Sequence, residues 1–460
     1  MGKKVKGVLR LDVPFSSEPP QLTSAVVGLP RIVKRAAHSF TMDVTVLDTA
    51  DARLQRAGVT VAHRVVDGMG EWFLDAPGWG PALPEQRVEP LGASGDLPDE
   101  FSRLLRPLLR RGVLGTLAAL DVERTEWSLR TDSGEDAAIV RDEKVTVMRS
   151  GMITGRYREV EITPTSRLTG QQREFLLSAG LAVGAAVVDR FPSTRRRIGA
   201  PASGLTSFPK PREFGPEATL EEFVTGVFAG HLDAIVRTDL QRRATDGDVA
   251  ELNARLWAFG RDLRGLAAVL DPHWREEVER HLENLPFTSP TDIEAPTLAV
   301  IDALVLAARA PRLGDLSHEP AATLLFQRAH QATVILAERC RALSPSSSEE
   351  AWQAALRAAE QLEVVLDVAA PLFPKHSGRL AKRLADVSDA LRRSSLGTVV
   401  GEPELDGLSA RQAYELGRET ERKRMQVAAV RQEFVERWPE RFRAARTLLE
   451  KARRRQERRP

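Results

Sequence analysis

The segment Val46–His63, VLDTADARLQRAGVTVAH, gives the strongest indication of the fold in the N-terminal part of the chain. It opens with apolar residues that end at Asp48, continues through a short polar run, and resumes after Gly58 with alternating apolar and polar residues. Alternation of this kind is typical of a strand with one buried face. The segment therefore predicts a strand, a turn, a short polar helix and a second strand.

The same short alternating pattern recurs up to about residue 200. Segments rich in Val, Thr and aromatic residues, bounded by Gly, Pro or Asp, are predicted as strands. They are FTMDVTVLD (40–48), GVTVAHRVV (58–66), EWFLDA (71–76), RTEWSLRT (124–131), EKVTVMRS (143–150) and YREVEIT (157–163). Helices are predicted at 97–112 and 165–184. Many strands with few helices favour an antiparallel sheet or barrel.

The C-terminal half has a helical period. Residues 195–219 are dense in Pro, Gly and Ser, which predicts a linker. Apolar residues three or four apart then form stripes typical of packed helices. One stripe is Leu252, Leu256, Phe259, Leu263, Leu266 and Leu270, and another is Trp352, Leu356, Ala359, Leu362 and Leu366. We predict an α+β chain with a strand-rich domain at 1–195, a linker at 196–218 and an all-helical bundle at 219–460.

Composition excludes several classes of protein. The 460 residues carry a formal charge of only +2, so the whole molecule is no general nucleic-acid binder. The basic end EKARRRQERRP is typical of a solvated tail, with polyanion binding as the alternative. The single Cys340 excludes an internal disulfide framework and a cysteine-rich metal site. We find no secretory h-region and no apolar run long enough to cross a bilayer, which predicts a cytoplasmic protein without membrane contact.

Several motifs follow one another in the order found in a known family. They are LDTADARLQRAGVTVAHR (47–64), EWFLDAP (71–77), VERTEWSL (122–129), VRDEKVTV (140–147) and YREVEI (157–162). This series resembles the CYTH domain, whose patterns include Y-Y-D-T-P, L-x-R-x-G, L-R-x-R and W-x-L-K-x-P. The resemblance covers about Lys4 to Asp189. With the linker and the helical half, the whole chain resembles the two-domain CYTH–CHAD proteins.

The CYTH resemblance implies a closed eight-stranded antiparallel tunnel in which basic residues hold a triphosphate and acidic residues hold Mg²⁺ or Mn²⁺. Residues two apart on a strand share one face, so the family's inward positions can be followed along this chain. The slots of the first strand, E-x-E-x-K, fall on Lys6, Val8 and Arg10. The remaining slots fall on Ala62, Arg64, Asp75, Arg124, Glu126, Glu159 and Glu161.

Roughly half of this tunnel chemistry is replaced. Arg10, Arg64 and Arg124 remain as candidate phosphate ligands, and Glu159 and Glu161 as candidate metal ligands. Lys6 stands where the family has a carboxylate, which favours internal ion pairs over a bound divalent cation. A working metal-dependent triphosphatase that uses rearranged residues is the alternative.

The CHAD resemblance implies two basic helices that face each other and bind inorganic polyphosphate. The first, at 250–270, retains Arg261 and Arg264. The second, at 351–373, retains Arg357 but has Glu360 and Glu363 in basic slots, where they would repel a polyanion. The alternative for all three arginines is that they lie on a solvated helix face and form only weak ion pairs. Trp257 is unusual on such a face and is expected to contact another helix or a partner.

Both sites are thus eroded relative to the family. The sequence predicts a non-catalytic interaction or scaffold protein without a cofactor, with residual phosphate or polyphosphate binding and a polyphosphate or protein partner. A metal-dependent inorganic triphosphatase or polyphosphate-binding protein is the first alternative, and Mg²⁺ or Mn²⁺ belongs only to its catalytic form. Contact of the basic C-terminal tail with nucleic acid is the second.

Overall fold

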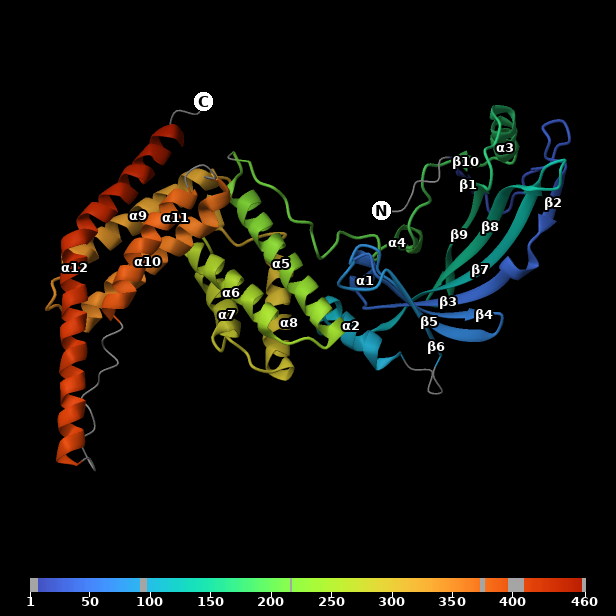
Figure 1. The fold of residues 1–460 in the computed structure, drawn as a ribbon. Coiled ribbons are helices and arrows are strands. Elements are labelled where there is room, and N and C mark those ends of the chain that lie inside the picture. Colours follow the sequence, from blue (N-terminus) through green and yellow to red (C-terminus); the bar gives the residue numbers. More distant parts are fainter. Residues whose placement is uncertain (1–6, 92–96, 216, 373–376, 396–408, 457–460) are drawn as a thin grey trace. The chain divides into compact units, whose positions relative to one another are not determined.

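The computed structural model describes residues 7–91, 97–215, 217–372, 377–395 and 409–456. Contacts within the chain divide it into two compact units. The sheet unit comprises residues 1–208 and 236–247, and the helical unit comprises residues 209–235 and 248–460. Each unit is described by itself, and their elements are labelled in Figure 1.

The sheet unit contains one antiparallel sheet, to which the described residues contribute ten strands in the order β10-β1-β9-β8-β7-β3-β4-β5-β6, with β2 paired to β7 off this path. The strands are β1 (Leu9–Val13), β2 (Arg31–Lys34), β3 (Phe40–Asp48), β4 (Thr60–Val66), β5 (Met69–Asp75), β6 (Gln86–Pro90), β7 (Gly115–Arg130), β8 (Asp136–Arg149), β9 (Met152–Pro164) and β10 (Ala186–Val187). The antiparallel sheet and the α+β class are confirmed. Within the described part of the chain no pairing joins β6 to β10, so the closed tunnel stays a prediction.

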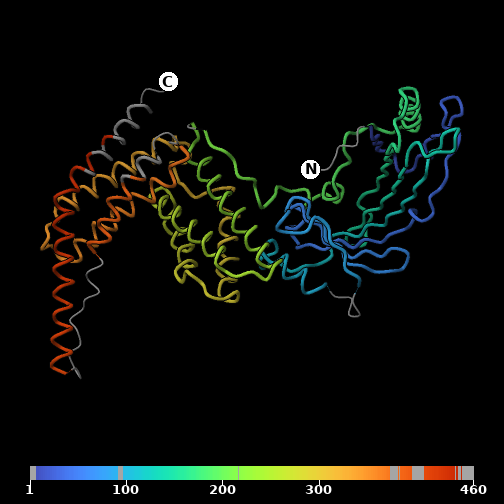
Figure 2. Tube along the Cα trace, in the orientation of Figure 1, coloured from blue at the N-terminus to red at the C-terminus, as the bar shows by residue number. Residues whose placement is uncertain are grey.

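The order of the strands does not follow the order of the sequence. Strand β1 pairs with β9, and β3 pairs with β7, as the trace in Figure 2 allows the reader to follow. Strands β7, β8 and β9 are long and pair along almost their whole length. They are longer than the segments predicted at 124–131, 143–150 and 157–163. The result is a continuous surface on which side chains from distant parts of the chain share one face.

The opening segment folds as predicted, because Asp48 satisfies the backbone of the turn. Strand β3 ends at Asp48, helix α1 (Arg53–Arg56) follows, and β4 begins at Thr60. The carboxylate of Asp48 is buried and accepts hydrogen bonds from the backbone N–H groups of Thr49 (2.7 Å), Leu54 (2.9 Å) and Gln55 (2.8 Å). Leu54 and Gln55 lie in the first turn of the helix, where backbone N–H groups have no acceptor within the helix itself. Burial nevertheless raises the pKa of Asp48, against the effect of the hydrogen bonds.

The two faces of the sheet have different coverings. On one face, helix α3 (Gly170–Ala182) packs on β1, and a Cβ at Gly180 would lie 2.7 Å from Leu11 Cδ1, so a larger residue there would require the buried Leu11 side chain to move. On the other face, Ile198 of helix α4 (Thr194–Ile198) and Ala202 are buried in an apolar cluster with β3, β4, β7 and β8. Both residues come from the stretch predicted as a linker. The sheet unit also contains η1 (Ala36–His38) and α2 (Asp99–Leu109).

The helical unit has its core between amphipathic helices. Its elements are α5 (Leu220–Thr245, shared with the sheet unit), α6 (Ala250–Gly265), α7 (Pro272–Leu282), α8 (Pro290–Ala307), η2 (Gly314–Leu316), α9 (Ala321–Arg341), α10 (Glu349–Ala369), η3 (Ala370–Leu372), α11 (Ser377–Ser395) and α12 (Ala410–Gln456). The stripe predicted at 252–270 is buried along its whole length. Trp352, fully buried, lies in the cluster that joins α9, α10, α11 and α12. Both predicted stripes are therefore confirmed as core.

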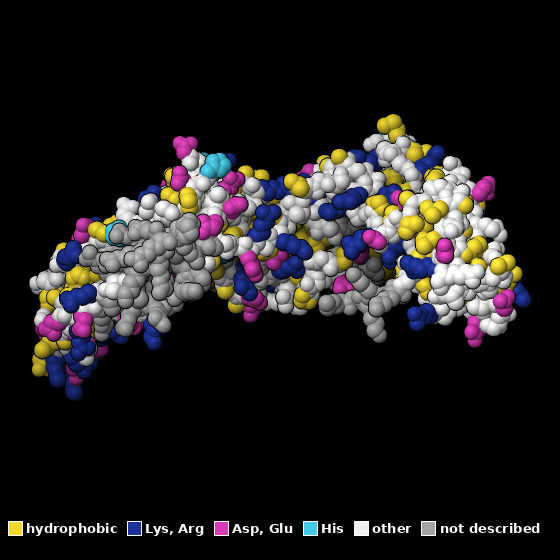
Figure 3. Space-filling view, turned by 90° about the horizontal axis from the view of Figure 1, so that it is seen from above, with side chains coloured by type: hydrophobic (Ala, Val, Ile, Leu, Met, Phe, Trp, Pro, Cys, Tyr) yellow, Lys and Arg dark blue, Asp and Glu magenta, His cyan; other side chains and the backbone are white. Residues whose placement is uncertain are grey.

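The surface carries charges of both signs. On the face seen in Figure 3, basic and acidic side chains are interspersed over both units. Among the described residues, no helix is long and apolar enough to span a membrane.

Candidate functional site

One face of the sheet carries a row of charges that we call the charged face. Its strand residues are brought together by the register: Arg10 lies opposite Glu161, Asp12 opposite Glu159, and Glu143 opposite both Glu159 and Arg124. The ion-paired residues of the face are six arginines and six carboxylates: Arg10, Arg35, Arg64, Arg124, Arg141 and Arg197, with Asp12, Glu71, Glu126, Glu143, Glu159 and Glu161. Their formal charges cancel.

Each arginine predicted on the strands forms an ion pair on this face. Arg10 donates to Glu161 at 2.8 Å, and Arg124 donates to Glu143 at 2.9 Å. Arg64 is bonded to Glu71 on the neighbouring strand. A triphosphate would have to displace a carboxylate from every one of these cations. The charged face therefore offers an anion no excess of positive charge.

The predicted metal ligands are also engaged by arginines. Glu159 accepts a hydrogen bond of 2.9 Å from Arg197, and Glu161 accepts bonds from Arg10 and from Arg141 at 3.0 Å. Burial raises the pKa of Glu159, which the Arg197 guanidinium opposes. Within the described residues no group of three His, Cys, Asp or Glu side chains could hold a metal ion. The donor set therefore does not fit a divalent cation.

Of the three slots aligned to the first strand, only Arg10 lies on a described strand. Strand β1 begins at Leu9, so Val8 precedes it, and Lys6 lies outside the described residues. Arg10 and Asp12 are the strand residues that face Glu161 and Glu159. Among the described residues, Glu161 pairs with Arg10 and Glu159 with Arg197, and the ion pair expected from Lys6 stays a prediction.

The other aligned slots lie on the same face with varied surroundings. Ala62 is buried in the apolar cluster, and Glu126 pairs with Arg35. Burial raises the pKa of Asp75, whose carboxylate accepts a hydrogen bond from Gln86. None of these positions supplies a cation to the face.

Sequence reasoning missed six members of the charged face: Asp12, Arg141, Glu143, Arg35, Glu71 and Arg197. The first three could have been found from alternation, because each lies two residues from a charged residue on the same strand. Arg197 follows the strands in a segment with no periodic pattern, so no sequence signal pointed to it.

The helical unit contains a cleft of about 760 Å³ that we call the arginine pocket. It is lined by Trp257, Arg261, Arg264, Arg357, Glu360, Gln361, Glu363, Val364 and Arg392. Helix α6 provides the first three residues, α10 the next five and α11 the last. The three arginines predicted in this half of the chain therefore lie together in one place.

A close contact between α6 and α10 builds the arginine pocket. A Cβ at Gly265 would lie 2.5 Å from the carbonyl oxygen of Val364 and 2.9 Å from Val368, so the helices meet where α6 has no side chain. Gln361 donates a hydrogen bond of 3.3 Å to the carbonyl oxygen of Arg264. Helices α6 and α10, which carry Arg261, Arg264 and Arg357, are therefore in direct contact.

The arginines of the pocket differ in their pairing. Arg261 is bonded to Asp367, and Arg392 lies 2.7 Å from Asp389 and 3.7 Å from Glu360. Arg264 and Arg357 are exposed, and neither forms an ion pair with another described residue. They are the cations in the pocket that an anion can reach without first breaking such a pair.

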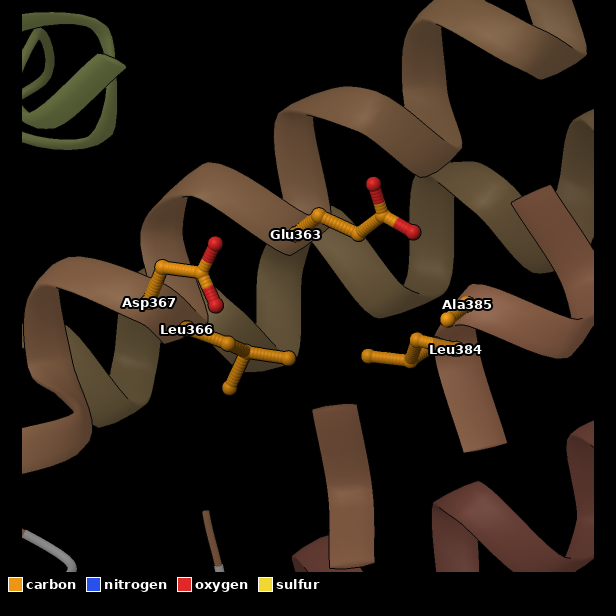
Figure 4. Close-up of a pocket in the computed structure, with 5 residues that line it drawn as sticks. All are labelled: Glu363, Leu366, Asp367, Leu384 and Ala385. Atoms are coloured by element: carbon orange, nitrogen blue, oxygen red, sulfur yellow. The ribbon is translucent and has the colours of Figure 1, made fainter. Parts of the chain in front are cut away.

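Two acidic features of the helical unit are distinct from the arginine pocket. Asp262 bonds to His231 of α5 at 2.8 Å and does not line the pocket. A second, smaller cleft of about 210 Å³ adjoins the arginine pocket through Glu363, and Figure 4 shows its lining. There Leu366 and Leu384 face each other beneath the carboxylates of Glu363 and Asp367. This second cleft is acidic and does not extend the anion-binding surface.

No family model matches the chain, and no curated protein matches it. Among solved structures, the chain is similar to a putative adenylate cyclase from Bacillus halodurans (16% identity, 35% of this chain and 83% of that one, TM-score 0.24). It is also similar to one from Vibrio parahaemolyticus (12%, 42% and 98%, 0.22) and to a putative adenylyl cyclase from Hippeastrum whose description states a dominant triphosphatase activity (15%, 43% and 98%, 0.22). At these TM-scores the likeness carries no argument about function.

Proposed function

We propose that the chain is a non-catalytic binding protein that holds a phosphate-rich anion in the arginine pocket of its helical unit. The observation that supports this is the position of Arg264 and Arg357. They project from different helices into one cleft, exposed and without an ion-pair partner among the described residues. Phosphate oxygens are strong acceptors for the planar fork of an arginine.

The charged face is assigned a structural role in this proposal. Its arginines and carboxylates are equal in number and are bonded to one another. Partly buried ion pairs of this kind fix the register of neighbouring strands and leave no net field to attract a polyanion. Tripolyphosphate with Mg²⁺ or Mn²⁺ should accordingly release no phosphate above the background rate. Metal-dependent turnover would favour the triphosphatase alternative.

Inorganic polyphosphate is the probe for the binding test. We expect binding at low ionic strength that weakens about tenfold or more between ~50 and ~200 mM salt, because phosphate contacts release counterions. An Arg264→Gln, Arg357→Gln double variant should lose about tenfold or more in affinity for each arginine.

Arg255→Gln is the matched control. Arg255 lies on the same helix as Arg264 and has the same charge, but it pairs with Glu251 and does not line the pocket. Its substitution should leave affinity within about twofold. Equal binding by the double variant and the control would overturn the proposal. The nucleic-acid alternative stays a prediction, since the tail side chains after Lys451 lie outside the described residues, and removing residues 452–460 tests it.

A further inference from the structure

Trp257 is the most exposed tryptophan among the described residues. Its side chain is 45% exposed, whereas Trp72, Trp79, Trp274 and Trp438 are each at most 8% exposed. It lies on α6 away from the apolar stripe, so the core of the helical unit does not require it. An indole left in water loses the free energy that its burial would supply. Its place is the rim of the arginine pocket.

Trp257 and the arginines are arranged along one side of α6. Arg261 follows Trp257 by four residues and Arg264 by seven, which places them about 6 Å and about 10 Å further along the helix axis at 1.5 Å per residue. The pocket therefore has an aromatic end and a cationic end. A ligand that extends along it could contact both.

We propose that the arginine pocket accepts a nucleoside phosphate, with its aromatic base stacked on Trp257 and its phosphates bonded to Arg264 and Arg357. This inference rests on the proposed function and names the class of anion. A flat base covers the exposed indole, and stacking on an aromatic side chain tolerates any base. A chain of inorganic phosphate would leave the indole uncovered.

The acidic residues of the pocket also favour a ligand that carries hydrogen-bond donors in addition to phosphates. Glu360 and Glu363 line the cleft beside the arginines. Their carboxylates repel an unbroken row of phosphates, but they accept hydrogen bonds from sugar hydroxyls and from base amino groups. Four arginines with two carboxylates therefore match a molecule that carries hydrogen-bond donors as well as anionic groups.

The test compares ATP with inorganic tripolyphosphate by calorimetry on the full chain at one ionic strength. We expect ATP to bind about 5- to 150-fold more tightly than tripolyphosphate, the range of one base stacked on an aromatic ring. Trp257→Ala should remove that advantage and leave tripolyphosphate affinity within about twofold. Trp257→Phe should retain most of it. Leu306→Ala, which truncates an exposed side chain on α8 (69% exposed), should change neither affinity.

The outcomes separate this inference from the proposed function. Equal binding of both ligands, lost in the Arg264→Gln, Arg357→Gln variant and unchanged in Trp257→Ala, overturns the nucleoside inference and leaves anion binding in the pocket. ATP binding that is unaffected by the arginine substitutions overturns the proposed function and the inference that rests on it. Equal losses in Trp257→Ala for both ligands show a structural role for the indole and overturn the inference.

Discussion

Arg197 donates a hydrogen bond of 2.9 Å from Nη2 to Glu159, and the same nitrogen lies 3.2 Å from a carboxylate oxygen of Asp12. The guanidinium carbon lies 4.3 Å from the ring centre of Tyr157. The guanidinium of Arg197, on α4, thus links the carboxylate of Asp12 on β1 to that of Glu159 on β9. We expect Arg197→Met to lower the free energy of unfolding by about 1–3 kcal/mol at neutral pH, because two partly buried carboxylates lose their counterion.

The loss should depend on pH in a defined direction. Burial raises the pKa of Glu159 above its ordinary value of 4.5, so its ionisation destabilises the fold as the pH rises through the raised value. Removing Arg197 removes the charge that opposes this shift. The deficit of Arg197→Met should therefore shrink as the pH falls toward 4.5, which urea unfolding at pH 7 and at mildly acidic pH will measure. Arg196→Met, an exposed neighbour on α4, is the control, and an unchanged deficit at both pH values would contradict the argument.

Asp48→Ala should destabilise the sheet unit by about 2–4 kcal/mol. The substitution leaves three buried backbone N–H groups, of Thr49, Leu54 and Gln55, without their acceptor. Thermal and urea unfolding will measure the loss. Asp43→Ala, at an exposed position of the same strand, should change stability by less than about 0.5 kcal/mol. Similar effects of the two substitutions would show that Asp48 does not fix the turn.

The turn at Asp48 also shows what the sequence could predict. Alternation is a local property, so it predicted the strands that became β3 and β4, whereas the shared face of Arg64 and Arg124 was expected only from the CYTH resemblance. Alternation could not give the strand order, because β1 pairs with β9 through contacts between residues far apart in the chain.

Other parts of the charged face and the arginine pocket could not be predicted from the sequence, for physical reasons. Arg197 reaches Asp12 across a sequence separation of 185 residues from a segment rich in Pro and Gly, where composition indicates only a loop. Arg264 and Arg357 were each predicted as candidate phosphate ligands. They can act together because Asp367 and Asp262 pair with other residues and because α6 and α10 meet at Gly265. The periodicity of the sequence predicts neither of these features.

Cys340 should resist modification in the native chain. The thiol is 1% exposed, and burial raises its pKa to about 12. Because the thiolate is the reactive form, a disulfide reagent at pH 8 should react about a thousandfold or more slowly than with a free thiol. In denaturant, one equivalent should react at once. Rapid reaction of the native chain would show that the core between α9 and α10 opens.

Gly265→Ala should weaken both the helical unit and its anion binding. The new Cβ would lie 2.5 Å from the carbonyl oxygen of Val364, so α6 and α10 must separate, at about 1–3 kcal/mol of stability. The same shift moves Arg264 away from Arg357, and polyphosphate affinity should fall. Gly260→Ala is the matched control on the same helix, since its Cβ would meet only Leu282 at 3.4 Å. Alanine there favours the helix by up to about 1 kcal/mol, so that variant should be no less stable than the parent.

The carboxylates around the arginine pocket compete with any bound anion, so removing them should strengthen binding. Asp367 neutralises Arg261, and Glu360 lies 3.7 Å from Arg392. Exposed pairs of this kind contribute about 0.2–1 kcal/mol, so Asp367→Asn and Glu360→Gln should each raise polyphosphate affinity by up to about fivefold with little change in stability. Glu251→Gln removes an acid of equal charge that pairs with Arg255 on α6 outside the pocket. An equal gain in affinity from Glu251→Gln would show that the effect comes from net charge alone. A gain confined to Asp367→Asn and Glu360→Gln would show that the anion binds among the arginines of the pocket.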